Sequence, residues 1–148
     1  IGIPWLFAFA MRTDGWYLRQ DIIWNKPNPM PESVRDRCTK SHEYIFLFSK
    51  NQNYHFDVDA IKEPTRRKRS VWSITKKPYK GAHFAVFPPE LIEPCILAGS
   101  EEGGFVLDPF IGSGTTAMVA KILNRNYIGC ELHEKYGELI KKRVADGF

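Results

Sequence analysis

Two acidic residues and a glycine-rich loop occur together in the second half of the chain. Asp108 follows an apolar run and opens the sequence DPFIGSGTT at residues 108–116, and Glu131 follows a second apolar run at residues 127–130. Glycines allow backbone amides to approach a bound group closely, and a carboxylate can bind the hydroxyls of a ribose. This combination predicts a binding site for a cofactor that contains a nucleoside.

The elements that would position these residues form a unit of strand, loop, helix and strand. Val106 and Leu107 predict the end of a buried strand, and residues 127–130 predict a second strand. Between the two, Thr115 and Thr116 open a predicted helix. The residues that share one face of this helix are Ala117, Ala120 and Leu123. In an open α/β sheet, ligands lie at the carboxyl ends of the strands, where the loop and Glu131 would meet.

The loop can be compared with other nucleotide-binding motifs. The spacing Gly112-x-Gly114-x-x-Ala117 satisfies the loose dinucleotide pattern, so an NAD-binding domain remains an alternative. The acid and the ring of Asp108 and Phe110 would repel a pyrophosphate and favour a cationic cofactor with an amino group. A Walker A loop is excluded because no Lys follows Gly114. A plain turn between strand and helix is the alternative without a ligand.

The motifs of this chain resemble those of the amino-type DNA methyltransferases of the β class, which modify adenine N6 or cytosine N4. The sequence DPFIGSGTT at residues 108–116 resembles their S-adenosylmethionine motif. HFAVFPPEL at residues 83–91 resembles the helix-opening segment beside the methionine end of the cofactor, and residues 24–28 and 42–50 resemble late strands of the sheet. The resemblance covers nearly the whole chain. It implies an α/β, Rossmann-like fold of the S-adenosylmethionine-dependent methyltransferases.

The resemblance also implies S-adenosyl-L-methionine as the cofactor and assigns residues to it. The residues that would line its pocket are Asp108, Phe110, Gly112 and Gly114. Thr115 and Thr116 would lie at the helix N-terminus near its carboxylate, and Glu131 would hold its ribose hydroxyls. The residues flanking its methionine side would be Pro88 and Leu91. Ile111 stands where many relatives have a small residue, which would narrow the loop.

The catalytic loop of the family does not occur in these 148 residues. That loop, Asp/Asn/Ser-Pro-Pro-Tyr/Phe, hydrogen-bonds the target amino group and stacks its aromatic ring on the flipped base. The nearest string, FPPE at residues 87–90, lacks both the polar first residue and the aromatic last one. We therefore assign no catalytic residue, leave adenine and cytosine open as targets, and expect the C-terminal part of an enzyme, inactive alone, from a truncated gene.

A missing catalytic loop also predicts missing central strands and a gap in the sheet. The missing N-terminal part, a second chain, a swapped partner or a non-standard strand pairing would have to close the gap, since each unpaired buried backbone group costs about 1–3 kcal/mol. The implied function is a site-specific DNA methyltransferase of a restriction-modification type. The alternative is an inactive DNA-binding remnant or subunit that needs a second chain for catalysis.

Length and composition predict one compact domain with a real core. The chain has 43% hydrophobic and 14% aromatic residues, and no apolar run approaches the roughly 20 residues of a membrane span. Three scattered cysteines, Cys38, Cys95 and Cys130, are too few for a disulfide framework or a zinc site. We expect them to be packing residues in a cytoplasmic protein of prokaryotic or phage origin, without a metal.

Cationic residues concentrate in the first part of the chain. Residues 1–80 hold 15 Lys and Arg against 8 Asp and Glu, whereas residues 81–148 hold 6 against 9. The basic part favours a polyanion, and the slightly acidic part favours a small cationic cofactor. By the resemblance, residues 1–148 form a partial methyltransferase domain. Within it, residues 51–80 are a short target-recognition segment and residues 81–148 are the cofactor-binding half.

Two segments are predicted to contact double-stranded DNA with a flipped target base. The proline-stiffened loop after residue 24 contributes Lys26, Asn28, Arg35 and Arg37. The second segment contributes Arg66, Arg67, Lys68 and Arg69, followed by Trp72, Lys76, Lys77, Tyr79 and Lys80. Cations suit phosphates, and aromatic rings can stack on bases. The shortness of the segment predicts modest or helper-dependent specificity, and a solvated charged loop is the alternative.

The remaining elements follow from apolar periodicity and proline positions. They are a helix at residues 1–12, strands at residues 16–24 and 42–49, a helix opened by Pro88 and Pro89 and bent by Pro94, and a helix at residues 133–144. The strand at residues 42–49 is predicted to be buried. The last helix is predicted to cover the sheet with Tyr136, Leu139, Ile140 and Val144. His42 beside Glu43 suggests acid and base chemistry, but such a His at a strand start is more typical of a structural role.

Overall fold

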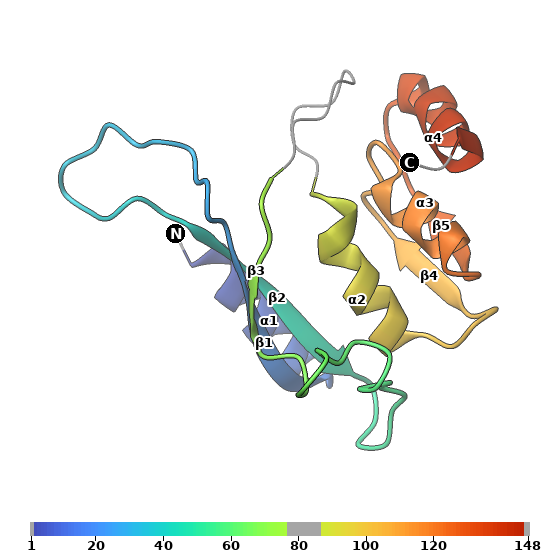
Figure 1. Ribbon diagram of the computed structural model, residues 1–148, viewed down its shortest axis with the longest axis horizontal. Coiled ribbons are helices and arrows are strands. Elements are labelled where there is room, and N and C mark those ends of the chain that lie inside the picture. Colours follow the sequence, from blue (N-terminus) through green and yellow to red (C-terminus); the bar gives the residue numbers. More distant parts are fainter. Residues whose placement is uncertain (1, 77–86, 147–148) are drawn as a thin grey trace. The chain divides into compact units, whose positions relative to one another are not determined.

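Two sheets divide the chain into two units (Figure 1). The computed structural model describes residues 2–76 and 87–146. Unit 1 spans Ile1–Tyr54 and Arg69–Thr75, and unit 2 spans His55–Lys68 and Lys76–Phe148. The boundary between the units therefore crosses residues 51–80 at three places, after Tyr54, after Lys68 and after Thr75. Of the sequence motifs, residues 83–86 lie outside the described residues, as do Lys77, Tyr79 and Lys80.

The predicted helices and strands are confirmed, and their ends agree within about two residues. Unit 1 contains α1 (Ile3–Thr13), β1 (Tyr17–Asn25), β2 (His42–Ser49) and β3 (Val71–Ser73). Unit 2 contains α2 (Pro89–Gly99), β4 (Phe105–Asp108), α3 (Thr115–Ile122), β5 (Asn126–Gly129) and α4 (Glu134–Asp146). β3 was not predicted, because a strand of this length carries too little periodicity to be recognised. In the part of the chain that is described, no helix is long and apolar enough to span a bilayer.

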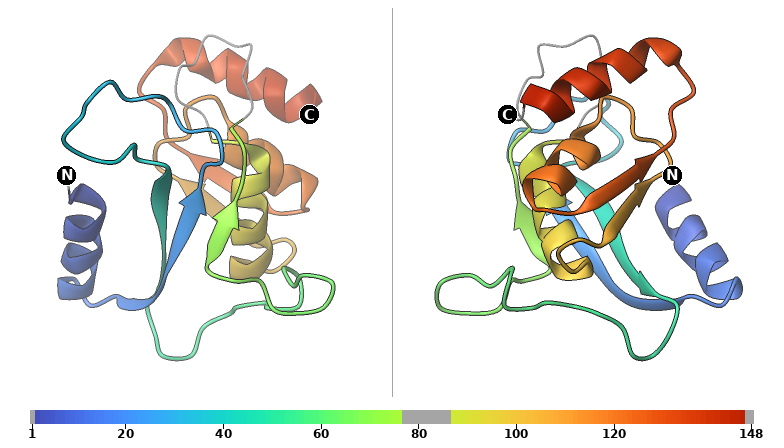
Figure 2. Two further views of the ribbon diagram at one scale, coloured as in Figure 1. Left: turned by 60° about the vertical axis from the view of Figure 1, so that its left-hand side comes forward. Right: turned by 90° about the vertical axis from the view of Figure 1, so that its right-hand side faces the viewer.

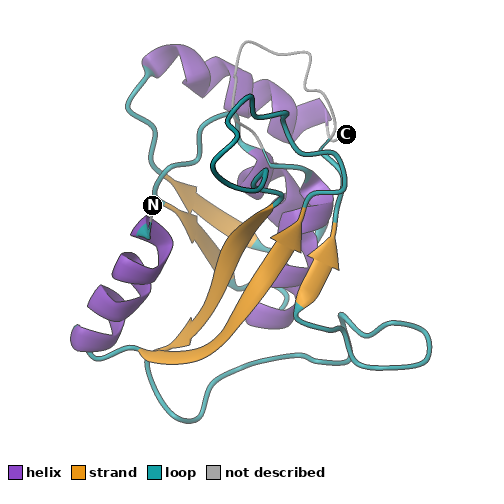
Figure 3. Cartoon of the chain, turned by 90° about the vertical axis from the view of Figure 1, so that its left-hand side faces the viewer, coloured by secondary structure: helices purple, strands orange, loops and turns teal. Residues whose placement is uncertain are grey.

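The sheet of unit 1 has the strand order β2-β1-β3 (Figure 3). β1 and β2 pair antiparallel from Tyr17 opposite Ser49 to Asn25 opposite His42. β3 pairs with the other edge of β1 in parallel, with Trp72 opposite Trp24. β3 thus gives the polar groups of this β1 edge a backbone partner, in a stretch whose sequence shows no strand pattern.

Two tryptophans form the centre of unit 1. Both Trp24 and Trp72 are buried. The indole N–H of Trp24 donates to the carbonyl of Ile74 at 2.8 Å, and that of Trp72 donates to the carbonyl of Arg69 at 2.7 Å. The prediction that Trp72 offers a ring for base stacking is therefore wrong, because the ring lies in the core and its polar atom is already bonded.

The β2 strand presents a row of aromatic rings along one face. Tyr44 and Phe46 stack with their centroids 5.9 Å apart, and His42 meets Tyr44 edge to face at 5.3 Å. Trp5 of α1 packs edge-on against Phe46 at 5.1 Å. Most of β2 is only half-buried, so the prediction of a buried strand is wrong. Exposed apolar side chains remain on α1, namely Ile3, Leu6, Phe7 and Phe9.

Unit 2 is built on the parallel pair β4 and β5, which are in register from Phe105 opposite Asn126 to Asp108 opposite Gly129. α3 packs along this pair, as Figure 2 shows, and α2 and α4 both pack on α3. The core consists of Ile96 of α2 with Met118, Val119 and Ala120 of α3. The predicted apolar face of α4 is half-buried, but α4 packs chiefly against α3 and does not cover the sheet directly, contrary to the prediction.

The β4 strand is exposed on the face away from α3. Phe105 is 70% exposed and Leu107 is 65% exposed, so the prediction that this strand is buried is wrong. Within the described residues, β5 is the only strand that pairs with β4, and β4 and β1 belong to separate sheets. This separation confirms the predicted interruption of the sheet.

The cysteines are a further correction. Cys38 and Cys130 are exposed and only Cys95 is partly buried, although all three were predicted to be packing residues. Cys38 lies in the loop between β1 and β2, and Cys130 follows a strand whose residues are all exposed.

The burial of Trp72 makes a testable prediction about unit 1. We expect Trp72→Ala to lower the free energy of unfolding by about 3–5 kcal/mol, since it leaves a cavity and removes a bonded indole. Val71→Ala is the matched control, because Val71 is the adjacent residue of β3 and is 57% exposed; its cost should stay within about 0.5 kcal/mol. Urea unfolding followed by circular dichroism measures both, and equal costs would contradict the assignment of Trp72 to the core.

Candidate functional site

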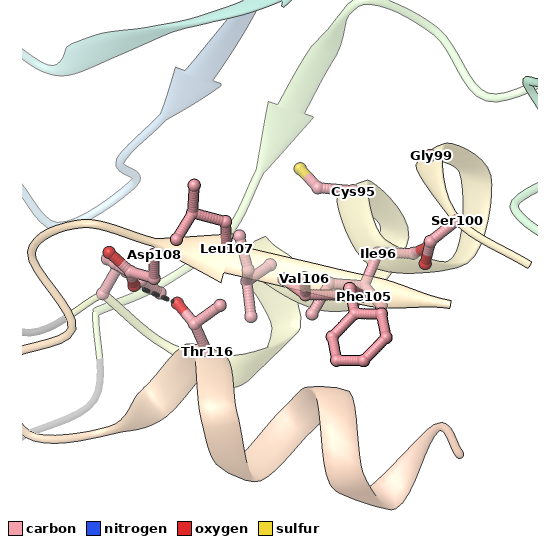
Figure 4. Close-up of a pocket in the computed structure, with 11 residues that line it drawn as sticks. Cys95, Ile96, Gly99, Ser100, Phe105, Val106, Leu107, Asp108 and Thr116 are labelled. Atoms are coloured by element: carbon pink, nitrogen blue, oxygen red, sulfur yellow. Dashed lines mark hydrogen bonds between the residues drawn. The ribbon is translucent and has the colours of Figure 1, made fainter. Parts of the chain in front are cut away.

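The carboxylate of Asp108 joins the end of β4 to the loop and to α3. Its Oδ1 accepts a hydrogen bond from the backbone N–H of Phe110 at 3.0 Å. Its Oδ2 accepts one from the hydroxyl of Thr116 at 2.6 Å, the dashed line in Figure 4. Both oxygens therefore fix the path of the chain between strand and helix. The side chain is half-buried, so one side of the carboxylate still faces solvent.

The glycines of the loop adopt conformations that other residues rarely adopt. Gly112 has φ 52° and Gly114 has φ 83°, both in the left-handed region. The Gly114 N–H donates to the carbonyl of Ile111 at 2.9 Å, and its own carbonyl accepts from the N–H of Met118 at 3.0 Å. Gly114 thus ends the loop and caps α3 without a side chain.

The second strand brings Glu131 beside this loop. The N–H of Cys130 donates to the carbonyl of Asp108 at 3.1 Å, and the N–H of Ile111 donates to the carbonyl of Cys130 at 3.1 Å. These bonds extend the β4–β5 ladder past both strand ends. Glu131 follows at once, and its Oε1 accepts from the N–H of His133 at 2.8 Å. The structure therefore brings together Asp108, the glycine loop and Glu131 at one edge of unit 2.

The remaining residues assigned to the cofactor have different surroundings. Phe110 is 88% exposed at the tip of the loop, whereas Thr115 and Thr116 are buried in the first turn of α3. Pro88 precedes α2, and its carbonyl accepts from the N–H of Leu91 at 3.0 Å. Pro88 and Leu91 are both buried.

A cavity of about 420 Å³ is lined by residues of α2, β4 and α3 (Figure 4). Asp108 and Thr116 line it, together with Phe87, Ile92, Cys95, Ile96, Gly99, Ser100, Phe105, Val106 and Leu107. Burial raises the pKa of the Cys95 thiol from its ordinary 9.0 to about 11, against an opposing effect of the Lys68 charge. Cys95 is therefore a protonated thiol near neutral pH and adds no charge to the cavity.

Sequence reasoning missed the close fit between Ile111 and Gly129. Ile111 is buried, and a Cβ at Gly129 would overlap its Cδ1 and lie 3.0 Å from its Cβ. The large side chain of Ile111 therefore fits because Gly129 of β5 has no side chain. The one available signal was Gly129 itself, because a glycine inside a strand often marks a close approach.

Of the predicted DNA contacts in unit 1, Lys26 is occupied by protein groups. It is 8% exposed, forms an ion pair with Glu43, and lies with Nζ 4.6 Å from the centre of the Trp24 ring. Glu43 is thus an ion-pair partner, and His42 packs on Tyr44. Asn28, Arg35 and Arg37 are exposed, and Arg37 bonds Glu32 at 3.1 Å. A polar cavity of about 440 Å³ follows β1, lined by Pro4, Lys26, Glu32, Lys40, His42, Glu43 and Tyr44.

The four cations of residues 66–69 differ in exposure and in ion pairing. Arg66 forms an ion pair with Glu63 across a tight turn, and Lys68 is half-buried. Arg67 and Arg69 are exposed. Between residues 2–76 and 87–146, no cluster of His, Cys, Asp and Glu has the arrangement to hold a metal ion.

Comparison with known proteins identifies the family of this chain. The family model N6/N4 methyltransferase, described as DNA methylase, matches residues 2–142. The chain belongs to this family of DNA methylases.

The chain is 56% identical to the Type II methyltransferase M.SmaI of Serratia marcescens, over 97% of this chain and 52% of M.SmaI. It is 54% identical to the Type II methyltransferase M.XycI of Xanthomonas campestris pv. cyanopsidis, over 97% of this chain and 50% of that protein. The chain thus spans about half the length of the curated relatives it matches.

Solved structures agree with the family. The chain matches the M1.HpyAVI–SAM complex with a TM-score of 0.75 at 30% identity, over 96% of this chain and 69% of that one. It matches the cytosine-N4-specific PvuII DNA methyltransferase with a TM-score of 0.76 at 21% identity, over 97% of this chain and 64% of that one, which shows the fold alone. The predicted α/β methyltransferase fold, present in part, is therefore confirmed.

The fit between Ile111 and Gly129 can be tested by substitution. We expect Gly129→Ala to cost about 1–3 kcal/mol in the free energy of unfolding, because the new methyl overlaps Ile111. Adding Ile111→Ala should restore part of this loss, so that the double variant is less destabilised than the sum of the two single variants. Urea unfolding of the three variants measures the coupling, and strict additivity would contradict the contact.

Proposed function

We propose that this chain is the cofactor-binding part of a DNA amino-methyltransferase that uses S-adenosyl-L-methionine. The observation that carries the proposal is the meeting of Asp108, the left-handed glycine loop and Glu131 at the ends of two parallel strands. Ligands of open α/β sheets lie at such ends, and two carboxylates suit a cofactor with cationic groups. The related protein M1.HpyAVI was solved as a complex with SAM.

The residues present fit this cofactor, and each has a chemical role in binding it. The carboxylate of Glu131 accepts hydrogen bonds from the ribose hydroxyls, while its bond from His133 orients it. Asp108 holds the loop in shape and contributes negative charge at its mouth. The half-buried Gly112 lets a ligand approach the backbone closely, Gly114 lets the chain turn into α3, and Phe110 supplies an exposed ring. Thr115 and Thr116 form the first turn of α3, whose N-terminus favours the cofactor's carboxylate.

The bound cofactor supplies an electrophilic methyl group on its sulfonium. The acceptor is the exocyclic amino nitrogen of adenine (N6) or cytosine (N4) in DNA, with the target base flipped out of the duplex. The Pro-Pro loop that would hold this amino group belongs to the rest of the protein, together with the strand that would pair with β4. The exposed Phe105 and Leu107 and the cavity beside them offer that strand an apolar surface.

The cofactor proposal is tested by calorimetric titration with S-adenosylmethionine and, separately, with NAD. We expect S-adenosylmethionine to bind and NAD not to bind, either to the chain alone or after the upstream-encoded polypeptide is added. Glu131→Ala should weaken binding at least about tenfold, because charge-assisted hydrogen bonds are lost, and Gly112→Val should abolish it. Glu134→Ala is the matched control, since Glu134 is an exposed carboxylate in the first turn of α4.

Three results would contradict the cofactor proposal. They are no binding of S-adenosylmethionine in either format, equal binding of NAD, and a Glu131→Ala variant that keeps full affinity. A binding response that requires the upstream polypeptide would identify the chain as one half of an enzyme.

We further propose that the exposed cations of both segments bind the phosphates of DNA. The proposal rests on the exposed cations Arg35 after β1 and Arg67 and Arg69 near β3, with Asn28 as an exposed hydrogen-bond donor. Arg37, Arg66 and Lys68 are assigned smaller contributions, because Arg37 is paired with Glu32, Arg66 is paired with Glu63 and Lys68 is half-buried. Lys26 is left out because it is buried against Glu43.

A binding function without chemistry is the second candidate, and it rests on the exposed cations Arg67 and Arg69. The cations of residues 66–69 would then serve only to bind DNA. Methyl transfer to DNA by the chain combined with its upstream polypeptide, but not by the chain alone, would support the first candidate. DNA binding without methyl transfer in both formats would support the second.

Salt dependence tests the DNA contacts. Replacing residues 66–69 with Ala should reduce the slope of log affinity against log salt by about 0.9 for each phosphate contact that is lost. Lys141→Ala with Lys142→Ala is the control, because both are exposed cations of α4, far along the chain from the segment. Fluorescence anisotropy with a labelled duplex at several salt concentrations gives the slopes, and an unchanged slope for the variant at residues 66–69 would contradict the assignment.

A further inference from the structure

Helix α4 hydrogen-bonds to the glycine loop through Arg143. Its Nη1 donates to the hydroxyl oxygen of Ser113 at 2.7 Å, across 30 residues of sequence. Ser113 is the middle residue of the Gly112-Ser113-Gly114 sequence and is only 3% exposed. A charged donor therefore reaches a buried hydroxyl inside the loop that is proposed to hold the cofactor.

Helix α4 also packs against the loop at Gly114, through the side chain and the Cα of Ile140. A Cβ at Gly114 would lie 3.2 Å from Cγ2 of Ile140 and 3.3 Å from its Cα. Ile140 and Arg143 are three positions apart and so lie on one face of the helix. This face contacts both Ser113 and Gly114, which fixes the loop at neighbouring residues.

Helix α4 is in turn connected to the carboxylate at the end of β5. Glu131 bonds the N–H of His133, and α4 begins at the next residue. The two parts of the proposed site, the loop and Glu131, are therefore joined by α4 as well as by the β4–β5 ladder. A change in the docking of α4 would affect both.

We propose that Arg143 is a positioning residue that holds residues 112–114 in the conformation that binds the cofactor. This inference rests on the proposed function, and Arg143 acts through Ser113 without touching the cofactor. Glycine-containing loops lose much conformational entropy on ordering, so such a loop needs an anchor to stay in one conformation. Without the guanidinium the loop visits other conformations, and the apparent dissociation constant rises as the competent fraction falls.

The test compares substitutions of Arg143 by two readouts on the 148-residue chain, with its upstream polypeptide where binding requires it. One readout is amide hydrogen exchange of residues 112–116, and the other is the dissociation constant of S-adenosylmethionine. For Arg143→Met we expect about tenfold faster exchange in the loop and about tenfold weaker binding. Arg143→Lys keeps a cationic donor and should recover much of the affinity. Lys141→Met is the matched control, because Lys141 is an exposed cation two residues away and should change neither readout.

A double-mutant cycle with Ser113→Ala separates positioning from general destabilisation. If Arg143 acts through Ser113, the double variant should bind no more weakly than Arg143→Met alone. Ser113→Ala is also the milder substitution if Arg143→Met fails to fold, and it should shift both readouts in the same direction.

Several outcomes would overturn the inference. These are loop exchange in Arg143→Met equal to that of Lys141→Met, additive effects in the cycle, or exchange that rises equally in α2 and β4. The exchange measurement needs no cofactor. A chain whose loop responds to Arg143→Met but which never binds S-adenosylmethionine would therefore refute the proposed function and leave the anchoring of the loop established.

Discussion

The hydrogen bonds of the Asp108 carboxylate are the constraint on which the proposed site depends. One oxygen holds the backbone of Phe110 and the other holds the hydroxyl of Thr116, so strand, loop and helix are joined at one residue. The left-handed glycines follow from this path, because the chain must turn from β4 into α3 within a few residues. The side chain that would supply negative charge for a cationic cofactor thus also builds the loop around it.

Other parts of unit 2 support this loop from behind. Ile111 fills the space that Gly129 leaves open in β5, and Ile140 contacts Gly114 from α4. The bonds between Asp108, Cys130 and Ile111 continue the sheet beyond its strands. By contrast, the outer face of β4 is uncovered, with Phe105 and Leu107 exposed. The glycine loop is therefore well packed from behind, whereas the outer face of β4 is not.

The errors of sequence interpretation concern side chains whose partners are far away in the chain. Trp72 was assigned to DNA, but β3 pairs with β1 and buries its ring. Lys26 was assigned to DNA, but β2 brings Glu43 beside it. In both cases the local pattern of cations and aromatic rings is compatible with a contact to nucleic acid and also with a contact inside the protein. A residue type shows what a side chain can bind, whereas its neighbours decide whether it is free to do so.

The sequence by itself determined the helices and strands, the family resemblance, and the identity of Asp108, the glycine loop and Glu131 as one motif. These depend on short-range spacing, since strand periodicity, helix-opening residues and glycine positions are local properties. Only the tertiary structure decided which cations are exposed, that Ile111 packs on Gly129, and that Arg143 reaches Ser113. These contacts depend on the pairing of strands and the packing of helices, which join residues that no local pattern relates.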